Sequence, residues 1–492
     1  MQVRLGDEMK AFNSWDLFEV TLAEGCSLVA IGNQWTIKGK RPRRQIFIRK
    51  DIRDLLEDFF QEKNDLDLTV EQSDLFFTLA AKGYIDIKVK KWDFEEYELP
   101  FISVIIPVKN RPEDIRDCLN SIFNIKWNKD RLEVIVVDDG SDDETPDIAE
   151  SLGAKVVRRA KSGGPSAARN AGAEVAQGDV LAFIDSDCTV DDTWLMDLAP
   201  YIMAKGIGAL GGFVASYYNT TPLDRYEEAM SSLSMGKRLL YEANTEGNFY
   251  VPTCNMLVRK DVFDEVGCLN PEMHLGEDVD LCWRVRNSGR GLLYVTTGRA
   301  WHKHRNALFQ MLKRRMQYGT SEADLYKRHQ EKKKVFPVPI TAFGFWLGLL
   351  LTVLTFNPWF LLITAFSFIV NAIRKKTLTK KLKDDVGFVE ILQIAWRTSV
   401  AFCYYLNFHL IRYYLVLLFI VGIFFPPLLL GLLIAFINCS VVDYKVKKPN
   451  LNYFQFSFFY LLEQVYYQIG VFAGCFQHKY LKSYLVRFKI SL

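Results

Sequence analysis

Several familiar binding patterns are missing from this sequence of 492 residues. Its nine cysteines are scattered, odd in number and include no CxxC pair, which argues against a disulfide framework or a zinc site and indicates reduced thiols. No GxGxxG follows the first strand of the α/β region, where Pro107-Val-Lys-Asn110-Arg111-Pro112 stands instead, so a dinucleotide dehydrogenase is disfavoured. A GxxxxGKS/T loop is also lacking, which disfavours the phosphoryl-transfer enzymes that hold phosphates in such a loop.

The chain carries little net charge and no recognisable export signal. Lys and Arg number 61 against 58 Asp and Glu, a net charge of +3, so no global field favours nucleic acid and none is expected as a partner. The amino-terminal stretch MQVRLGDEMKAFNSWD lacks the charged-then-apolar order of a secretory signal. We therefore expect the catalytic part to stay in the cytoplasm. The length accommodates two or three domains, each with its own core.

One short stretch, Ala182-Phe-Ile-Asp185-Ser-Asp187-Cys188, is the most informative. The apolar run Val180–Ile184 has the length and composition of a buried strand, and it delivers two carboxylates at its carboxyl end. Ligands of open α/β sheets bind at that edge, and two Asp one residue apart offer the oxygen ligands with which a hard divalent cation bridges to a diphosphate. Asp-Ser-Asp is also ordinary turn chemistry, so a solvated turn is the alternative.

Strand and helix patterns alternate in the region that leads up to that stretch. Apolar runs of strand length alternate with amphipathic helices, and the second run, Leu132–Asp139, also ends in carboxylates. This alternation is typical of a parallel, doubly wound sheet, so the predicted fold class is α/β. The predicted strands are 102–107, 132–139, 155–158 and 180–184, and the predicted helices are 112–123, 144–152 and 167–176.

Five motifs in this region carry a family resemblance. They are SVIIPVKNRPEDIRDCLNSI (103–122), EVIVVDDGSDDET (133–145), GGPSAARNAG (163–172), FIDSDC (183–188) and GEDVDLCWRVRNSG (276–289). Their order and spacing resemble those of the family 2 glycosyltransferases, the inverting nucleotide-sugar enzymes of the GT-A fold. The resemblance covers about residues 101–305 and implies a GT-A core that binds a nucleoside-diphosphate sugar.

The resemblance implies a nucleotide pocket built from residues far apart in the chain. Pro107 and Asp139 line the nucleobase and ribose pocket, Asn110 belongs to the same set, and Arg169 reaches toward the nucleotide. Asp185 is shared between that set and the metal site. An Arg suits such a pocket because it can stabilise the negative charge that a departing nucleoside diphosphate gains.

The metal site and the base are implied by the same resemblance. Asp185 and Asp187 correspond to the DxD pair, which holds Mg²⁺ or Mn²⁺ against the diphosphate. Asp278, in the acidic start of a helix after Gly276, corresponds to the base that takes the acceptor proton, and an ordinary helix-capping Asp is the alternative. His302 follows a predicted strand and either ligates the metal, touches phosphate or packs beneath the sheet, and the sequence leaves open whether His302 or His304 touches the metal.

Residues 1–98 form a separate unit by their own pattern. Three short strand-like runs, separated by Gly-Asn and Gly-Lys-Arg-Pro turns, precede two helices and a final hairpin-like wing, an order typical of a small winged-helix module. Asp51 is placed to cap the first helix and Thr69 the second. The acidic helices do not resemble a nucleic-acid recognition helix. The pattern resembles the PqqD-like domains, which bind leader or precursor peptides of ribosomally made natural products, and a packing or regulatory domain is the alternative.

The composition changes after residue 334. Two pairs of nearly charge-free runs, each pair joined through proline, predict two helical hairpins. Basic segments flank the hairpins, which favours a multi-pass inner-membrane protein with its catalytic domain in the cytoplasm. Two further segments mix aromatics with Glu, Gln and Arg, as interfacial amphipathic helices do. The predicted hairpins are 335–373 and 411–443, the predicted interfacial helices are 388–408 and 451–476, and the predicted domains are 1–98, 99–330 and 331–492.

The combination of a PqqD-like front domain, a family 2 core and a membrane region resembles the mycofactocin-system glycosyltransferases, which decorate a redox cofactor made from a ribosomal peptide. That resemblance implies UDP-glucose as the donor, a peptide-derived acceptor and attachment to the membrane. Two alternatives stay open. One is a transferase that acts on polyprenyl phosphate or a cell-surface glycan, and the other is a catalytically silent, membrane-tethered peptide-binding scaffold. The carboxylates of Asp139, Asp185, Asp187 and Asp278 argue against the scaffold.

Overall fold

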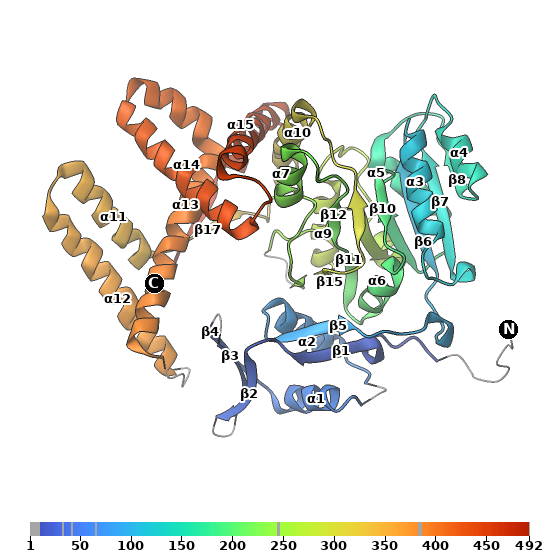
Figure 1. Cartoon of the computed structure of the whole chain (residues 1–492), viewed down its shortest axis with the longest axis horizontal. Coiled ribbons are helices and arrows are strands. Elements are labelled where there is room, and N and C mark those ends of the chain that lie inside the picture. The colour runs from blue at the N-terminus through green and yellow to red at the C-terminus, as the bar shows by residue number, and fades with distance from the viewer. Residues whose placement is uncertain are drawn as a thin grey trace. The chain divides into compact units, whose positions relative to one another are not determined.

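The structure, a computed structural model, describes residues 10–31, 34–40, 43–63, 66–243, 247–381 and 386–491. The chain divides into two compact units, Met1–His304 and Arg305–Leu492 (Figure 1). The turns expected at Gly32-Asn33 and Arg41-Pro42 lie outside the described residues.

An eight-stranded sheet forms the centre of the first unit, in the order β13-β15-β11-β14-β9-β6-β7-β8. The four strands β9, β6, β7 and β8 run parallel, as the alternation of strands and helices predicts. β14 instead pairs antiparallel with both β9 and β11, so the sheet as a whole is mixed. A strand that pairs antiparallel needs no helical crossover to reach its neighbour, so strands and helices need not alternate in this part of the chain. The strands are β6 (Ile102–Val108), β7 (Leu132–Asp138), β8 (Lys155–Arg158), β9 (Val180–Ile184), β11 (Ile207–Gly211), β13 (Leu240–Glu242), β14 (Asn255–Arg259) and β15 (Gly291–Tyr294).

Helices cover both faces of this sheet. Because side chains alternate along a strand, Val104 and Ile106 of β6 pack into one apolar core, whereas Ile105 packs into the other. The first core includes apolar residues of α3 (Pro112–Phe123), α4 (Thr145–Ser151) and α6 (Trp194–Met203). The second includes those of α5 (Gly164–Val175), α8 (Lys260–Glu265) and α9 (Glu277–Asn287). This layering leaves the carboxyl ends of the parallel strands at one edge, where the site residues gather.

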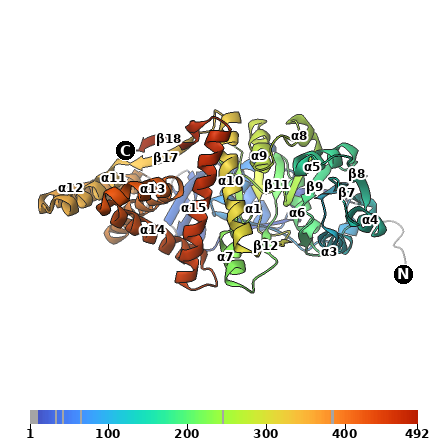
Figure 2. The same ribbon diagram turned by 90° about the horizontal axis from the view of Figure 1, so that it is seen from above.

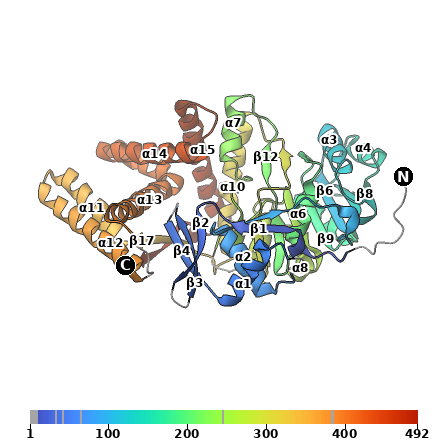
Figure 3. The same cartoon turned by 60° about the horizontal axis from the view of Figure 1, so that its bottom comes forward.

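The amino-terminal module has two small sheets and two helices (Figure 3). β5 pairs antiparallel with β1, so the last strand closes back on the first rather than forming a hairpin-like wing. The three central strands form an antiparallel sheet in the order β2-β3-β4. The elements are β1 (Phe18–Leu22), β2 (Cys26–Ile31), β3 (Gln34–Lys40), β4 (Arg43–Ile48), α1 (Lys50–Phe60), α2 (Val70–Ala81) and β5 (Ile85–Val89).

The two helices of the module begin differently from each other. Thr69 caps α2 through a reciprocal capping box with Gln72, as predicted. The prediction that Asp51 caps α1 is wrong, because Asp51 lies inside the first turn and the N-cap is Arg49. Asp51 instead forms an ion pair of 3.0 Å with Arg49, which satisfies its carboxylate without a backbone donor at the cap.

The module shares a hydrophobic core with the sheet rather than having one of its own. Phe18 of β1 packs against Tyr201 of α6 with ring centroids 4.8 Å apart, and the Tyr201 hydroxyl donates to the Ile87 carbonyl at 3.1 Å. The Tyr241 hydroxyl of β13 donates to the carboxylate of Asp74 on α2. Burial raises the pKa of Asp74, although that hydrogen bond opposes the rise. Buried polar and apolar contacts therefore join residues 10–98 to the catalytic sheet in a single unit.

The second unit is built mainly from helices. α10 (Leu308–Arg328) and α15 (Tyr453–Gln477) lie side by side (Figure 2). Gly319, Gly470 and Gly474 permit this close approach, because a Cβ atom at any of them would meet backbone atoms of the opposite helix. A parallel ribbon of β17 (Lys334–Pro339) and β18 (Val486–Ser491) joins two distant parts of this unit.

The remaining helices form two apolar hairpins within this unit. α11 (Ile340–Thr355) and α12 (Leu361–Lys381) turn at Asn357-Pro358, and α13 (Phe388–Phe424) and α14 (Pro426–Lys447) turn at Phe425. By length and composition, α13 and α14 are the two helices of the described chain able to cross a membrane. The structure joins the predicted interfacial helix 388–408 and the first arm of the predicted hairpin 411–443 into one helix, because no Gly or Pro interrupts 388–421.

Candidate active site

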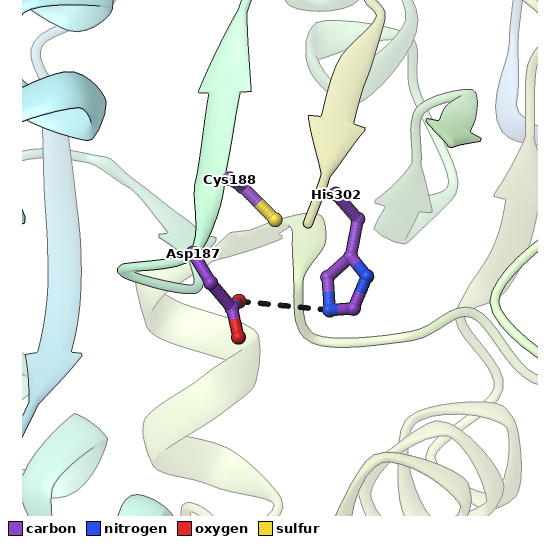
Figure 4. Close-up of side chains that lie close together, drawn as sticks. All are labelled: Asp187, Cys188 and His302. Atoms are coloured by element: carbon purple, nitrogen blue, oxygen red, sulfur yellow. Dashed lines mark ion pairs between the residues drawn. The ribbon is translucent and has the colours of Figure 1, made fainter. Parts of the chain in front are cut away.

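Two of the three predicted metal ligands, Asp187 and His302, meet beside the carboxyl end of β9, whereas the carboxylate of the third, Asp185, is paired with Arg169. Asp185 and Asp187 follow that strand directly, and β10 (Cys188–Val190) pairs antiparallel with β16 (Ala300–His302), so that Cys188 lies opposite His302. This register brings His302 Nε2 to 3.5 Å from Asp187 Oδ1 (Figure 4). One ligand atom each of Asp187, Cys188 and His302 lies within 4.8 Å of the others.

The donor atoms fit a hard divalent cation. Asp187 Oδ1 is buried and has no hydrogen-bond partner among the described residues, although it faces His302 Nε2. Burial raises the pKa of the Cys188 thiol, and a thiol ligates metals as the thiolate, so Cys188 contributes little. Carboxylate oxygens with one imidazole suit Mg²⁺ or Mn²⁺ better than the thiolate-rich sets that select zinc.

His302, and not His304, faces this cluster. His304 Nδ1 lies 2.8 Å from Ser216 Oγ and its Nε2 lies 3.4 Å from Asp224, so both ring nitrogens are engaged with β12 (Val214–Ser216) and α7 (Pro222–Met230). The sequence alone left open which of these two histidines approaches the carboxylates, and the register of β10 with β16 decides it.

Arg169 connects the two acidic motifs. Its guanidinium, only 3% exposed, lies 2.5 Å from Asp185 on one side and 3.3 Å from Glu277 on the other. It projects from α5, which packs tightly on the sheet: a Cβ at Gly172 of that helix would approach Ile105 Cγ2 to 2.5 Å. The predicted reach toward the nucleotide therefore runs through Asp185, since the guanidinium itself is enclosed.

Asp278 lies in the first turn of α9 without capping that helix. The N-cap is Gly276, with φ of 79°, and Asp278 lies inside the helix, so the prediction of a helix-capping Asp is wrong. Burial, and next the negative charge of Glu277, raise the pKa of Asp278 to about 7, against a 2.8 Å hydrogen bond from the Val279 N–H. A carboxylate with a near-neutral pKa is well suited to accept a proton under physiological conditions.

Asp139 is held by the loop before α5. It accepts hydrogen bonds of 2.8 Å from Ser162 Oγ and from the Gly164 N–H, and it is paired with Arg159. Burial pushes the pKa of Asp139 up, but the hydrogen bonds from Gly163, Ser162 and Gly164 together hold it below its usual range. Asp139 is therefore ionised at neutral pH and fixes the shape of this edge.

Pro107 and Asn110 complete the same edge. Pro107 lies near the end of β6, and Asn110 follows it with φ of 51°. The Asn110 N–H donates to Ser141 Oγ and its Oδ1 accepts from the Asp142 N–H, both at 2.9 Å, which ties the loop after β6 to the loop after β7.

Three charged residues that the sequence did not single out share the site. Arg111 lies 2.9 Å from Asp187 Oδ2, Glu277 bonds to Arg169, and Arg159 bonds to Asp139. Arg159 directly follows β8, and Arg111 follows β6 by a few residues. Because the ends of parallel strands share one edge of the sheet, the sequence could have predicted both residues to lie near the site. For Glu277 the only signal was its place beside Asp278.

The sequence of this chain is similar to those of several known proteins. The model of the family Glycosyl transferase family 2 matches residues 103–267. The pre-mycofactocin glycosyltransferase of Mycobacterium tuberculosis is 29% identical over 348 residues, which cover 70% of this chain and 71% of that protein. Glycosyltransferase AglE of Haloferax volcanii is 32% identical over 46% of this chain and 75% of its own length.

Among solved structures, TarS of S. aureus is 20% identical with a TM-score of 0.35, and the match covers 45% of this chain and 39% of TarS. The motifs, the mixed sheet with its carboxylates at one edge and the match to AglE agree on one assignment. This chain belongs to glycosyltransferase family 2, with an α/β core of the GT-A type.

Proposed function

We propose that this chain is a membrane-associated inverting glycosyltransferase that transfers glucose from UDP-glucose to a hydroxyl of a peptide-derived redox cofactor of the mycofactocin type. The similarity to the pre-mycofactocin glycosyltransferase carries this proposal, since it spans 348 residues whereas the family match spans only 103–267. The alternative acceptor is polyprenyl phosphate or a cell-surface glycan, and the experiment below compares polyprenyl phosphate with the peptide-derived acceptor.

The donor side of the site is proposed to be held by residues of the sheet edge. The nucleobase and ribose would lie beside Pro107, Asn110 and Asp139. Arg169 orients Asp185 through their ion pair. Asp185, Asp187 and His302 would hold a divalent cation, which when bound neutralises charge on the diphosphate leaving group. Arg111, at 2.9 Å from Asp187 Oδ2, stabilises that carboxylate and adds positive charge where the leaving group departs.

The acceptor side is proposed to depend on Asp278. In its ionised form it takes the proton of the acceptor hydroxyl as that oxygen attacks the anomeric carbon from the face opposite the diphosphate. Attack from that face inverts the anomeric configuration. Glu277 keeps the pKa of Asp278 high enough for the proton to be accepted, and its own charge is balanced by Arg169 at 3.3 Å.

The proposed domains are a PqqD-like peptide-binding module (1–98), the catalytic domain (99–330) and a membrane region (331–492). α14, with 22 residues, is about 33 Å long, close to the thickness of the hydrocarbon layer. The basic residues Lys445 and Lys447 end α14, and they suit a hairpin that returns to the cytoplasmic side. The catalytic domain then faces the cytoplasm, where nucleotide sugars are made.

The test is UDP release from UDP-glucose by the detergent-solubilised full chain with Mn²⁺ or Mg²⁺. Release stimulated by a peptide-derived acceptor fraction, and not by polyprenyl phosphate, supports the proposal. Stimulation by the lipid alone leaves the chain a transferase and overturns the peptide acceptor. The anomeric configuration of the product, read by NMR, tests inversion directly.

Substitution of the proposed metal ligands should weaken cation binding. We expect Asp187→Asn or His302→Gln to reduce Mn²⁺ affinity roughly tenfold or more, because each removes one donor from the cluster. The loss of the free Mn²⁺ signal in electron paramagnetic resonance measures this without any turnover.

Asp192→Asn is the matched control for the metal site. Asp192 is an exposed carboxylate a few residues after the cluster and is paired with Lys126 rather than with His302. Equal weakening by Asp192→Asn would show that Mn²⁺ responds to general negative charge, and would contradict the assigned ligands.

A further inference from the structure

A polar cavity of about 420 Å³ lies in the second unit at the open end of the α11–α12 hairpin. Its lining combines the side chains of Thr341, Asn371 and Thr398 with two cations, Arg374 and Lys375, and none of the described residues that line it is a carboxylate. Such a lining offers hydrogen-bond donors and positive charge. Its chemistry suits an anion that carries several acceptor oxygens.

The floor of the cavity contains polar groups that are nearly enclosed. Thr341 is 8% exposed, and its side chain lines the cavity. Asn371 is 4% exposed and donates to the Ala395 carbonyl at 3.2 Å. A hydroxyl and an amide at the inner wall of a cavity can form hydrogen bonds to the oxygens of a ligand there.

The start of α11 adds a second attraction for an anion. This helix of 16 residues begins at Ile340 after Pro339, and no side chain caps it. The N–H groups of a first turn have no partner inside the helix and carry partial positive charge. Thr341, in that first turn, lines the cavity, so the helix start, the enclosed hydroxyl and the two cations converge on one space.

Arg374 and Lys375 keep their charge available. Neither forms an ion pair with a carboxylate among the described residues, whereas many other cations of the chain do. Both lie on α12 immediately after Ile373, the last residue of its apolar stretch. The boundary between apolar and basic sequence thus falls at the cavity.

The hairpin above the cavity exposes a large apolar surface. Phe356 is 91% exposed, Trp359 74% and Phe366 69%. α11 is about 24 Å long, which is shorter than the hydrocarbon layer, so the hairpin can dip into a bilayer with its turn in the hydrocarbon and its open end near the phosphates. A lipid beside this hairpin would have its phosphate at the level of the cavity.

We propose that this cavity binds the phosphate group of a membrane lipid, with the acyl chains along the α11–α12 hairpin. The assignment rests on the proposed membrane association of this unit. It gives the basic segment after α12 a specific function beyond general attraction to an anionic surface, and it is separate from the sugar-transfer site.

Native mass spectrometry of the detergent-solubilised full chain tests the proposal, with phosphatidylglycerol and phosphatidylcholine as probes. We expect one phosphatidylglycerol to bind more tightly than phosphatidylcholine. Arg374→Ala and Lys375→Ala should each weaken that binding roughly fivefold. Thr341→Val, which keeps the shape of the side chain, should also weaken it, because the hydroxyl is lost.

Lys376→Ala is the matched control, since Lys376 lies on the same helix and is exposed but does not line the cavity. Equal weakening by Lys376→Ala would overturn the cavity as the site in favour of diffuse charge. If inorganic phosphate displaces phosphatidylglycerol as well as added lipid does, the ligand of the cavity is free phosphate and the assignment to a lipid is overturned. UDP release is measured on the same preparations, so selective lipid binding without transfer would count against the proposed function alone.

Discussion

Replacement of Asp278 by asparagine is expected to lower the rate of sugar transfer by roughly 10²–10⁴-fold, the usual contribution of a positioned general base. The amide keeps the size of the side chain and cannot accept the acceptor proton. Binding of UDP-glucose should change little, because Asp278 is proposed to act on the acceptor and not on the nucleotide. Single-turnover kinetics, together with calorimetric titration of UDP, separate these two effects.

The pH dependence of the native enzyme is a second readout of the same residue. Because the base acts in its ionised form and its pKa is raised to about 7, kcat/KM should rise with pH up to about 7 and level off above it. Glu272→Gln is the control, since Glu272 is an exposed carboxylate a few residues before α9. A transfer rate unchanged in Asp278→Asn, or lowered as much in Glu272→Gln, would contradict the assigned base.

Replacement of Arg169 by methionine is expected to have the largest effect on stability. The guanidinium is 3% exposed and balances the carboxylates of Asp185 and Glu277 at once. Its removal leaves negative charge in the interior without a partner, which typically costs about 3–5 kcal/mol. Thermal unfolding of the full chain, followed by tryptophan fluorescence, should show a clearly lower midpoint.

Arg158→Met is the matched control for Arg169→Met. Arg158 ends β8 and pairs with Asp147 and Glu150, but all of these side chains are exposed, so water replaces the lost partner and the midpoint should hardly move. The Arg169 variant should also show a pH profile for transfer displaced to higher pH, because the positive charge that opposes the raised pKa of Asp278 is gone. An unshifted midpoint in Arg169→Met would contradict its bridging role.

The α/β part of the fold could be predicted from local pattern. The apolar runs from Ile102 to Ile184, and the helices between them, follow from strand and helix periodicity and from the right-handed crossovers that link parallel strands. The antiparallel direction of β14 could not be predicted from this pattern, because the sequence after β9 no longer alternates between strand and helix. The mixed composition of residues 388–424 led us to predict two separate helices there. The structure has the single helix α13, because no residue within most of this range would break a helix.

The site was predicted as a set of positions, and the structure supplied their contacts. The carboxylates after β7 and β9 were evident because the ends of parallel strands share one edge. The partners of those carboxylates were not evident: Arg169 bonds to a residue 108 positions away, and Arg111 to one 76 positions away. The first pairing depends on the packing of α5 and α9 against the sheet, and the second on the neighbouring positions of β6 and β9 within it, and no local pattern encodes either.

The sequence by itself determined the order of strands and helices around Asp185 and Asp187 and the capping box at Thr69, since each depends on residues close together in the chain. It also determined the family, because the order and spacing of the motifs can be read along the chain. Only the tertiary structure decided that His302 rather than His304 faces Asp187, that Arg169 lies between Asp185 and Glu277, and that the amino-terminal module shares its core with the catalytic sheet. The physical reason is that these contacts join segments far apart in sequence. They are stabilised by burial and charge compensation in the folded chain, and local propensity has no part in them.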